Sequence, residues 1–283
     1  MDWARAKTIL IIAFVITNIF LAYNVWENKY YGHRSERISD DRIEELVDIL
    51  QQRGIRVSAP IPKDLYTNEI LTVEYLEIDT DGLMETVFGR KGINPVVQGD
   101  SVRHAERGIV LEVKNNREIF YKNLNLRNKP EQGLTQQQAV KTCEDFLKEH
   151  SLYNPSMVVE SIEETEGGYF LSFDQRYKDK LLEKSFVEME VTSGGVHSLH
   201  MLWLNPVKGE NSRKKISHAI DALIKVASRK EVQESIPAEI DSIRLVHYFD
   251  WESAREGEAF PAWRISVKGE AYYVNALTGQ VSK

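Results

Sequence analysis

Residues 8–26, near the N-terminus, carry no charged side chain, and this run constrains the chain more than any other feature. As a helix it would be roughly 28 Å long, which matches the hydrocarbon core of a bilayer. Aromatic residues stand near both of its ends, where membrane interfaces concentrate them. We therefore expect one transmembrane helix over 8–26. The residues expected at the membrane interfaces are Trp3, Arg5, Lys7, Tyr23 and Trp26.

A cleaved signal peptide and a buried globular helix are the alternatives for this run. The run is longer than a usual signal-peptide core, and no small-x-small cleavage site follows it. A buried helix at the end of a chain would rarely be apolar on every side. Arg5 and Lys7 favour a cytoplasmic N-terminus, although cations after the run, such as Lys29, weaken the charge bias. We expect the chain to run from the cytoplasm to the outside.

Polar side chains inside the run suggest a contact with another membrane helix. An asparagine amide that faces lipid lacks hydrogen-bond partners, and a bond to a second helix contributes about 0.5–2 kcal/mol. A chain with one span has no second helix of its own, so the partner would be another chain. The alternative is that one asparagine is tolerated without a role. The residues expected to contact a partner helix are Thr17, Asn18 and Asn24.

Composition restricts the remaining possibilities. Of 283 residues, 42% are hydrophobic and 28% are charged, which excludes a multi-span transporter, a collagen-like rod and a fully disordered chain. The single cysteine excludes an internal disulfide and a cysteine-rich zinc site. The formal net charge of −7 gives no electrostatic reason for nucleic-acid binding, and none is expected.

A polar connector, residues 27–38, leads from the span to a folded part that begins with a helix. Ser39 is the expected N-cap and Gly54 the expected stop, and apolar residues recur between them with helical spacing. From 55 to 128 the pattern is typical of β-strands. The elements expected in this stretch are a short helix near 83–88 and a hairpin of 108–114 and 117–122.

The second half contains the same order of elements twice, a helix followed by antiparallel strands. The first helix begins at Thr135, which forms a capping box with Gln138, and the second lies near 216–229. This order predicts an α+β fold in which a helix covers one face of the sheet in each unit. The strands expected after the first helix are 157–164, 169–176, 186–192 and 196–204, and those after the second are 240–249, 262–268 and 271–275.

Residues 205–209 are the expected boundary between these two units, and 128–133 the boundary before the first. The expected organisation is a cytoplasmic tail (1–7), a transmembrane helix (8–26), a juxtamembrane connector (27–38), an N-terminal α+β unit (39–130) and two helix-plus-antiparallel-sheet units (131–206 and 207–283).

The chain lacks the motifs of common catalytic and nucleotide-binding sites, including the P-loop, His-Glu-x-x-His and Gly-x-Ser-x-Gly. His197 and His200 would face opposite sides of a strand, so they cannot share a metal. Asp79 begins a partial calcium-loop pattern that is better interpreted as a helix cap, because later ligands are missing. Cys143 lies on an apolar helical stripe, and Glu163-Glu164 is typical of solvated surface. We expect no enzyme activity, no cofactor and no metal site.

The N-terminal residues resemble those of a known family. Met1-Asp2-Trp3, with Arg5 and Lys7-Thr8-Ile9, runs into Phe14 and then Asn18-Ile19-Phe20-Leu21, which closely resembles the N-terminus of the YycI (WalI-type) family of Gram-positive bacteria. The stretch 261–281 resembles the closing strands of that family's ectodomain. The resemblance implies a single transmembrane helix followed by helix-plus-antiparallel-sheet units of PepSY-like or YycH-like type.

The resemblance also implies a role and partners. Members of the family act with a YycH-type regulator on the YycG (WalK) sensor histidine kinase, which controls cell-wall metabolism. It therefore implies a non-enzymatic regulator in the cell membrane, with a cytoplasmic N-terminus and an extracellular C-terminal domain. A ligand- or peptide-sensing module and an anchored cell-wall enzyme are the alternatives. The residues leave open whether the kinase is activated or inhibited, and whether a small molecule binds.

Overall fold

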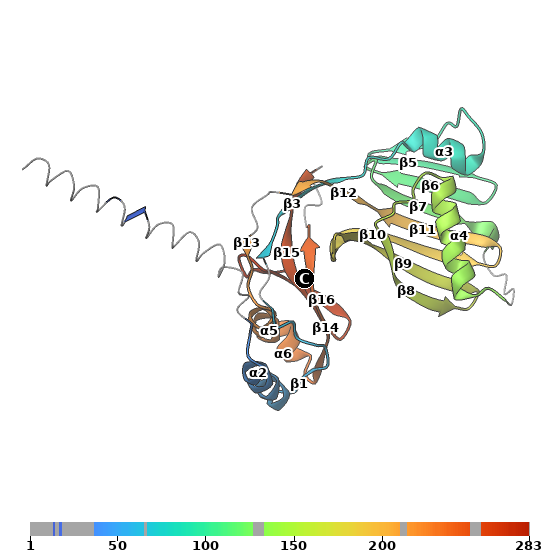
Figure 1. Cartoon of the computed structure of the whole chain (residues 1–283). Helices are drawn as coiled ribbons and strands as arrows, with labels where there is room; N and C mark the ends of the chain where they lie inside the picture. Colours follow the sequence, from blue (N-terminus) through green and yellow to red (C-terminus); the bar gives the residue numbers. More distant parts are fainter. Residues whose placement is uncertain are drawn as a thin grey trace, which may run out of the picture.

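In a computed structural model, the chain is an α+β protein built mostly of β-strands (Figure 1). The structure describes Phe14, Thr17, Asn18 and residues 37–64, 67–126, 133–209, 214–249 and 256–282. The helices are α2 (Asp40–Gln52), α3 (Thr80–Phe88), α4 (Gln136–Glu149), α5 (Ala219–Ala227) and α6 (Lys230–Glu234), with a 3-10 turn η1 (Leu124–Leu126). The strands are β1 (Ile55–Val57), β2 (Thr67–Asn68), β3 (Leu71–Tyr75), β4 (Val96–Gln98), β5 (Ser101–Glu106), β6 (Ile109–Lys114), β7 (Glu118–Asn123), β8 (Met157–Thr165), β9 (Gly168–Tyr177), β10 (Lys180–Thr192), β11 (Gly195–Leu202), β12 (Leu204–Gly209), β13 (Lys214–Lys215), β14 (Ala238–Tyr248), β15 (Glu256–Val267), β16 (Glu270–Asn275) and β17 (Val281–Ser282).

One continuous sheet contains most of the described strands. Strand β10 connects its two parts, because it lies between β14 and β11. Along the sheet the order is β12-β3-β15-β14-β10-β11-β7-β6-β5-β4. β10 pairs antiparallel with β9 and β11, and it meets β14 in parallel through Leu182 and His247. We call the part with α3, α4 and β4–β11 the α4 lobe, and the part with α2, α5, α6, β1 and β14–β17 the α5 lobe (Figure 1).

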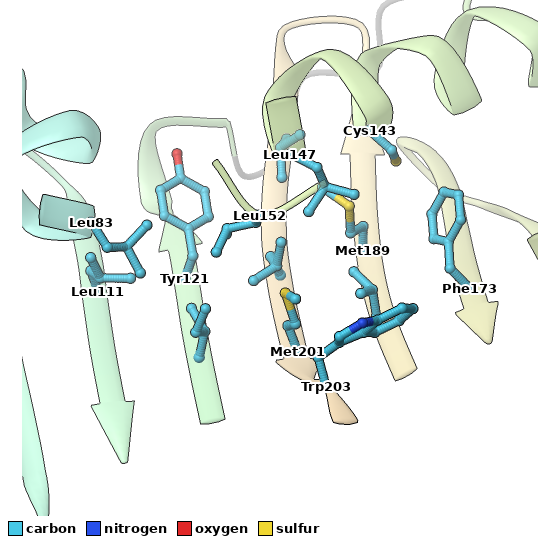
Figure 2. Close-up of a cluster of buried hydrophobic side chains, with 14 of the residues drawn as sticks. Leu83, Leu111, Tyr121, Cys143, Leu147, Leu152, Phe173, Met189, Met201 and Trp203 are labelled. Carbon is cyan, nitrogen blue, oxygen red and sulfur yellow. The ribbon is translucent and has the colours of Figure 1, made fainter. Parts of the chain in front are cut away.

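α4 covers one face of the sheet in the α4 lobe. The predicted capping box is confirmed: the Gln138 N–H donates to Thr135 Oγ1 at 3.3 Å, and the Thr135 N–H donates to Gln138 Oε1 at 2.9 Å. The apolar stripe of α4 lies over β10 and β11 and buries Cys143 and Leu147 completely (Figure 2). Burial raises the pKa of the Cys143 thiol to about 12, so the residue packs as a small apolar side chain, as predicted.

Replacing Thr135 with alanine is expected to destabilise the chain by about 1 kcal/mol, because the first turn of α4 loses its side-chain acceptor. Gln137→Ala is a matched control, since Gln137 is an exposed neighbour that takes no part in the capping box. Urea denaturation compares the two variants with the wild type. Equal midpoints for Thr135→Ala and Gln137→Ala would contradict the prediction.

The N-terminal helix α2 and the C-terminal helix α5 pack into one core, although they are far apart in sequence. β1 pairs in parallel with β14, with Ile55 beside Ala238. The core therefore combines Leu50 and Ile55 with residues of the C-terminal strands. At its centre Trp263 is fully buried, and its Nε1 donates to the Ser217 carbonyl at 2.9 Å, which connects β15 to the residues before α5.

Two hairpin turns follow from particular residues. In the predicted hairpin of β6 and β7, Asn115 and Asn116 adopt φ values of 52° and 54°, which asparagine tolerates better than most residues. The Arg117 N–H then closes the turn by donating to the Lys114 carbonyl at 3.0 Å. At the start of β9, a Cβ on Gly168 would overlap the Val191 carbonyl oxygen, so the close approach of β9 to β10 requires glycine there.

Residues 205–209, the predicted boundary between two units, form part of strand β12. β12 lies at the edge of the sheet and pairs with β3, and its register shifts between Pro206 and Lys208. A proline is tolerated there because an edge strand leaves one side without ladder partners. The predicted N-terminal unit 39–130 contributes strands to both lobes, and the predicted unit boundaries themselves stay a prediction.

Candidate partner-binding face

The sheet of the α4 lobe has one covered face and one face that α3 and α4 leave open. Both helices pack on the face that carries Leu111 and Tyr121. Because side chains alternate along a strand, the neighbours of these residues point to the other face. We call this second surface the open face. The residues that define it, on β5, β6, β7, β10 and β11, are Arg103, Glu112, Phe120, Lys122, Glu188 and His200.

An aromatic stack occupies the centre of the open face. The His200 imidazole lies on the Phe120 ring, with centroids 4.4 Å apart and planes inclined by 16°. The ring of Phe186 meets the same imidazole edge-on, at 4.9 Å between centroids. The three rings come from β7, β10 and β11, so the backbone ladder holds them in place and they form a preformed apolar surface.

The carboxylates of the open face have partners within the face. His200 Nε2 lies 2.8 Å from Glu118 Oε1, and His200 Nδ1 lies 3.6 Å from Glu188 Oε2. Glu112 accepts a hydrogen bond from Ser101 Oγ at 2.8 Å. Glu118 and Glu112 are therefore held by side chains of neighbouring strands, while Glu188 lies beside the His200 ring.

A groove with a volume of about 360 Å³ lies over this stack. Val110, Phe120 and Phe170 give it apolar surface, while Arg103 and Lys122, which also line it, are exposed. Neither cation forms an ion pair with another residue that the structure describes. The groove thus places two unpaired cations beside aromatic rings, an arrangement that can hold a carboxylate next to an apolar group.

A second hollow, of about 770 Å³, lies beside the end of β3 and the turns after β4 and β6. Its lining is mostly polar, with the carboxylates of Glu74, Glu77 and Asp100. The Arg117 guanidinium there lies 4.3 Å from the centroid of the Tyr75 ring. Because the Tyr75 ring in this hollow is already covered by Arg117, the open face with its three-ring stack is the stronger candidate for binding another protein.

Ionisable side chains also lie where β8–β10 meet the α5 lobe. Glu183 accepts a hydrogen bond from Tyr273 Oη at 2.9 Å, and its carboxylate lies 3.4 Å from Arg264 Nε. Burial raises the pKa of Glu183. Burial, with the nearby Glu160 and Glu183 carboxylates, raises the pKa of Asp174 to about 6. Asp174 is therefore expected to take up a proton in mild acid.

His247 lies at the same junction, on β14, and is 2% exposed. Burial and the nearby Lys180 cation lower the pKa of His247 to about 4. Its Nδ1 has no hydrogen-bond partner among the residues that the structure describes. The neutral imidazole is thus the form that fits this site.

The predicted membrane residues are described only in part. Thr17 and Asn18 are helical and exposed, and the Asn18 Nδ2 donates to the Phe14 carbonyl at 3.0 Å. The amide therefore has a partner in its own helix, and its contact with another chain stays a prediction. Within the described part of the chain, no helix has both the length and the apolar composition needed to cross a membrane. The predicted residues that lie outside the described residues are Trp3, Arg5, Lys7, Tyr23, Asn24 and Trp26.

Two other single-residue interpretations are confirmed, those of Asp79 and of the Glu163-Glu164 pair. Asp79 caps α3 by accepting a hydrogen bond from the Gly82 N–H at 3.1 Å. The predicted regular alternation between His197 and His200 is wrong, because the register of β10 and β11 shifts between Glu190 and Val191. His197 is buried, with its Nδ1 2.9 Å from the Asn123 carbonyl oxygen and its Nε2 3.9 Å from Glu190 Oε2, whereas His200 lies on the open face. The Glu163-Glu164 pair is exposed.

The open face was not found from the sequence. The sequence predicts strands of this face over 108–114, 117–122, 186–192 and 196–204, whereas β5, which carries Arg103, lies in a stretch predicted only as typical of β-strands. The sequence does not indicate that β7 lies beside β11, with Phe120 opposite His200. That register creates the groove.

Comparison with known protein families shows one family to which the sequence is similar. The family described as YycI protein matches residues 34–277. The chain belongs to the YycI family. This YycI match includes the α4 lobe with all of the open face and the α5 lobe up to Leu277, while residues 8–26 precede it. A search of curated proteins finds no match.

Two solved structures are similar to this YycI-family chain. An uncharacterized protein from Eubacterium rectale ATCC 33656 aligns over 81% of this chain and 91% of its own, with 13% identity and a TM-score of 0.52. At that identity the similarity shows the fold alone. The Bacillus megaterium YpeB C-terminal domain aligns over 73% of this chain and 98% of its own, with 14% identity and a TM-score of 0.34, which is too low to support a shared fold.

Proposed function

We propose that this chain is a non-enzymatic, membrane-anchored regulator of two-component signalling. Its target is a sensor histidine kinase of the YycG/WalK type, on which it acts together with a YycH-type protein. The observation that carries the proposal is the YycI family match over residues 34–277. The open face supports it, because a regulator that acts by contact needs a surface with unpaired groups outside its own core.

The proposal places residues 8–26 across the cell membrane, with the N-terminus in the cytoplasm and both lobes outside. The length and apolar composition of that run support this placement. Two contacts with the kinase complex follow: one between membrane helices, and one between domains outside the membrane.

The mechanism is a shift between two arrangements of the kinase. A partner that binds one arrangement more tightly increases its population, and the shift cannot exceed the difference in binding free energy. Typical couplings of this kind amount to about 1–3 kcal/mol, or roughly 5- to 150-fold in the equilibrium. No chemical step on the regulator is required.

Affinity purification of the full chain from membranes tests the proposal. We expect the sensor kinase and the YycH-type protein to co-purify, and deletion of the chain to change expression of the genes that the kinase controls. Absence of the kinase from the purified complex, with unchanged gene expression in the deletion strain, would overturn the proposal.

Replacing residues 8–26 with an unrelated membrane helix of equal length is expected to abolish this regulation. A simple tether needs only length and apolarity, whereas this run also carries polar residues that another helix can meet. Reporter expression should then equal that of the deletion strain. Protease accessibility from outside the cell is the control, because it verifies that the swapped protein is still exported. Normal regulation by the swapped protein would show that the contact lies wholly outside the membrane.

A further inference from the structure

We propose that the groove on the open face receives a segment of the sensor kinase's extracytoplasmic domain that carries an acidic side chain next to an apolar one. The carboxylate lies between Arg103 and Lys122, and the apolar side chain lies on Phe120. This inference rests on the proposed function and adds to it the surface and the chemistry of the contact.

The strand register places the two cations on either side of the groove floor. Arg103 on β5 is opposite Glu112 on β6, and Glu112 is opposite Phe120 on β7. Lys122 stands two residues further along β7 and is opposite Val110. Neighbouring strands are about 4.8 Å apart and alternate residues about 7 Å apart, so Arg103 and Lys122 lie within reach of one carboxylate.

Charge complementarity selects an acidic partner. The carboxylates of Glu118 and Glu188 approach the two ring nitrogens of His200, while neither Arg103 nor Lys122 has an ion pair among the described residues. An incoming carboxylate would gain charged hydrogen bonds to both cations. An incoming ammonium group would have to compete with His200 for Glu118 and with the Ser101 hydroxyl for Glu112.

The aromatic rings at the bottom of the groove favour a partner segment with an apolar side chain. Phe120 and Phe170 are each half-buried and line the groove, and the His200 imidazole holds the Phe120 ring by stacking. Rings held in advance lose little freedom when a partner covers them, so an apolar side chain gains affinity there. Since the helices of the α4 lobe pack on the other face, none of them needs to move.

The test is a double charge reversal in the full chain, R103E with K122E. The matched control is K91E with K141E, which changes the net charge equally at two exposed lysines of the same lobe that lie outside the groove. We expect the groove variant to co-purify about tenfold less sensor kinase from membranes than the wild type, and the control variant to retain it. Melting temperatures of all three proteins should agree within a few degrees, since all four positions are exposed.

Photo-crosslinking identifies the occupant. A benzophenone amino acid in place of Phe170 is expected to crosslink to a kinase segment with an aspartate or glutamate beside an apolar residue, while the same group in place of Lys141 should not. Exchange of that acidic residue for lysine should restore binding to the R103E, K122E variant. If the groove variant co-purifies as much kinase as the wild type, the proposal that the kinase binds in the groove is wrong. A crosslink only to a second copy of this chain would also contradict it. If the wild type itself captures no kinase, the proposed function fails.

Discussion

Alanine in place of Trp263 is expected to lower the free energy of unfolding by about 3–5 kcal/mol, the range for removing a buried aromatic side chain. Trp263 is fully buried in the core that joins α2, α5 and the C-terminal strands. The substitution leaves a cavity there, and it also leaves the Ser217 carbonyl without the indole donor that bonds it at 2.9 Å.

Trp263→Phe separates these two losses. It keeps most of the apolar volume and removes the hydrogen bond to Ser217, so a smaller cost of about 1–2 kcal/mol is expected. Urea denaturation followed by circular dichroism measures both variants. A cost below 1 kcal/mol for Trp263→Ala would mean that the α5 lobe does not depend on this core.

Local patterns predicted most helices and strands because their causes are local. The Thr135 and Gln138 capping box starts α4 where expected, and Asn115-Asn116 closes the expected hairpin. Asp79 caps α3, in agreement with the interpretation of its partial calcium-loop pattern as a helix cap. In each case the deciding contact spans only a few residues.

The arrangement of the elements could not be predicted in the same way. β1 pairs with β14 through Ile55 and Ala238, and β3 lies between β12 and β15. These pairings join segments from opposite ends of the chain, and many short apolar strands could satisfy the same pattern. Residues 205–209 indicate a boundary between units when taken alone, whereas at the edge of the sheet they form strand β12.

The candidate site is harder still to predict, because every residue in it faces outward. Arg103 and Lys122 have the character of ordinary solvated cations on their own strands. Only the neighbours supplied by other strands, Glu112 and the aromatic stack with His200, make the groove. A membrane anchor, by contrast, depends on one uninterrupted run of residues. Residues 8–26 therefore indicate it without information about neighbouring strands.

Mild acid is expected to change the stability of the chain in two opposite directions, through His247 and Asp174. These groups lie at the junction of the lobes but have different neighbours: Lys180 and Glu69 act on His247, and Glu160 and Glu183 act on Asp174. Their pKa values move in opposite senses from the ordinary values of their types.

Buried His247 destabilises the fold in acid. Its pKa is about 4 in the folded chain against 6.5 for the ordinary side chain, so between these values the unfolded chain binds more protons. Stability is therefore lost as the pH falls from 6.5 to 4, by about 3 kcal/mol at most, since one pKa unit corresponds to about 1.4 kcal/mol.

Asp174 acts in the opposite sense. Its pKa is about 6 in the folded chain against 3.8 for the ordinary side chain, so the folded chain binds more protons between these values. Stability is gained as the pH falls from 6 to 3.8, by less than about 3 kcal/mol because the carboxyl group is partly solvated.

Substitution of His247 and substitution of Asp174 should therefore change the pH dependence of the free energy of unfolding in opposite directions. His247→Leu should gain stability relative to the wild type as the pH falls from 6.5 to 4, and should change little at pH 7.5 because the imidazole Nδ1 has no partner among the described residues. Asp174→Asn should be more stable than the wild type at pH 7.5 and lose that advantage by pH 4. Urea denaturation at half-unit pH steps measures both differences, and comparison with the wild type at each pH cancels the titration of all other groups. Parallel profiles for the three proteins would mean that the junction is open to solvent, and that neither group is held in the form its burial favours.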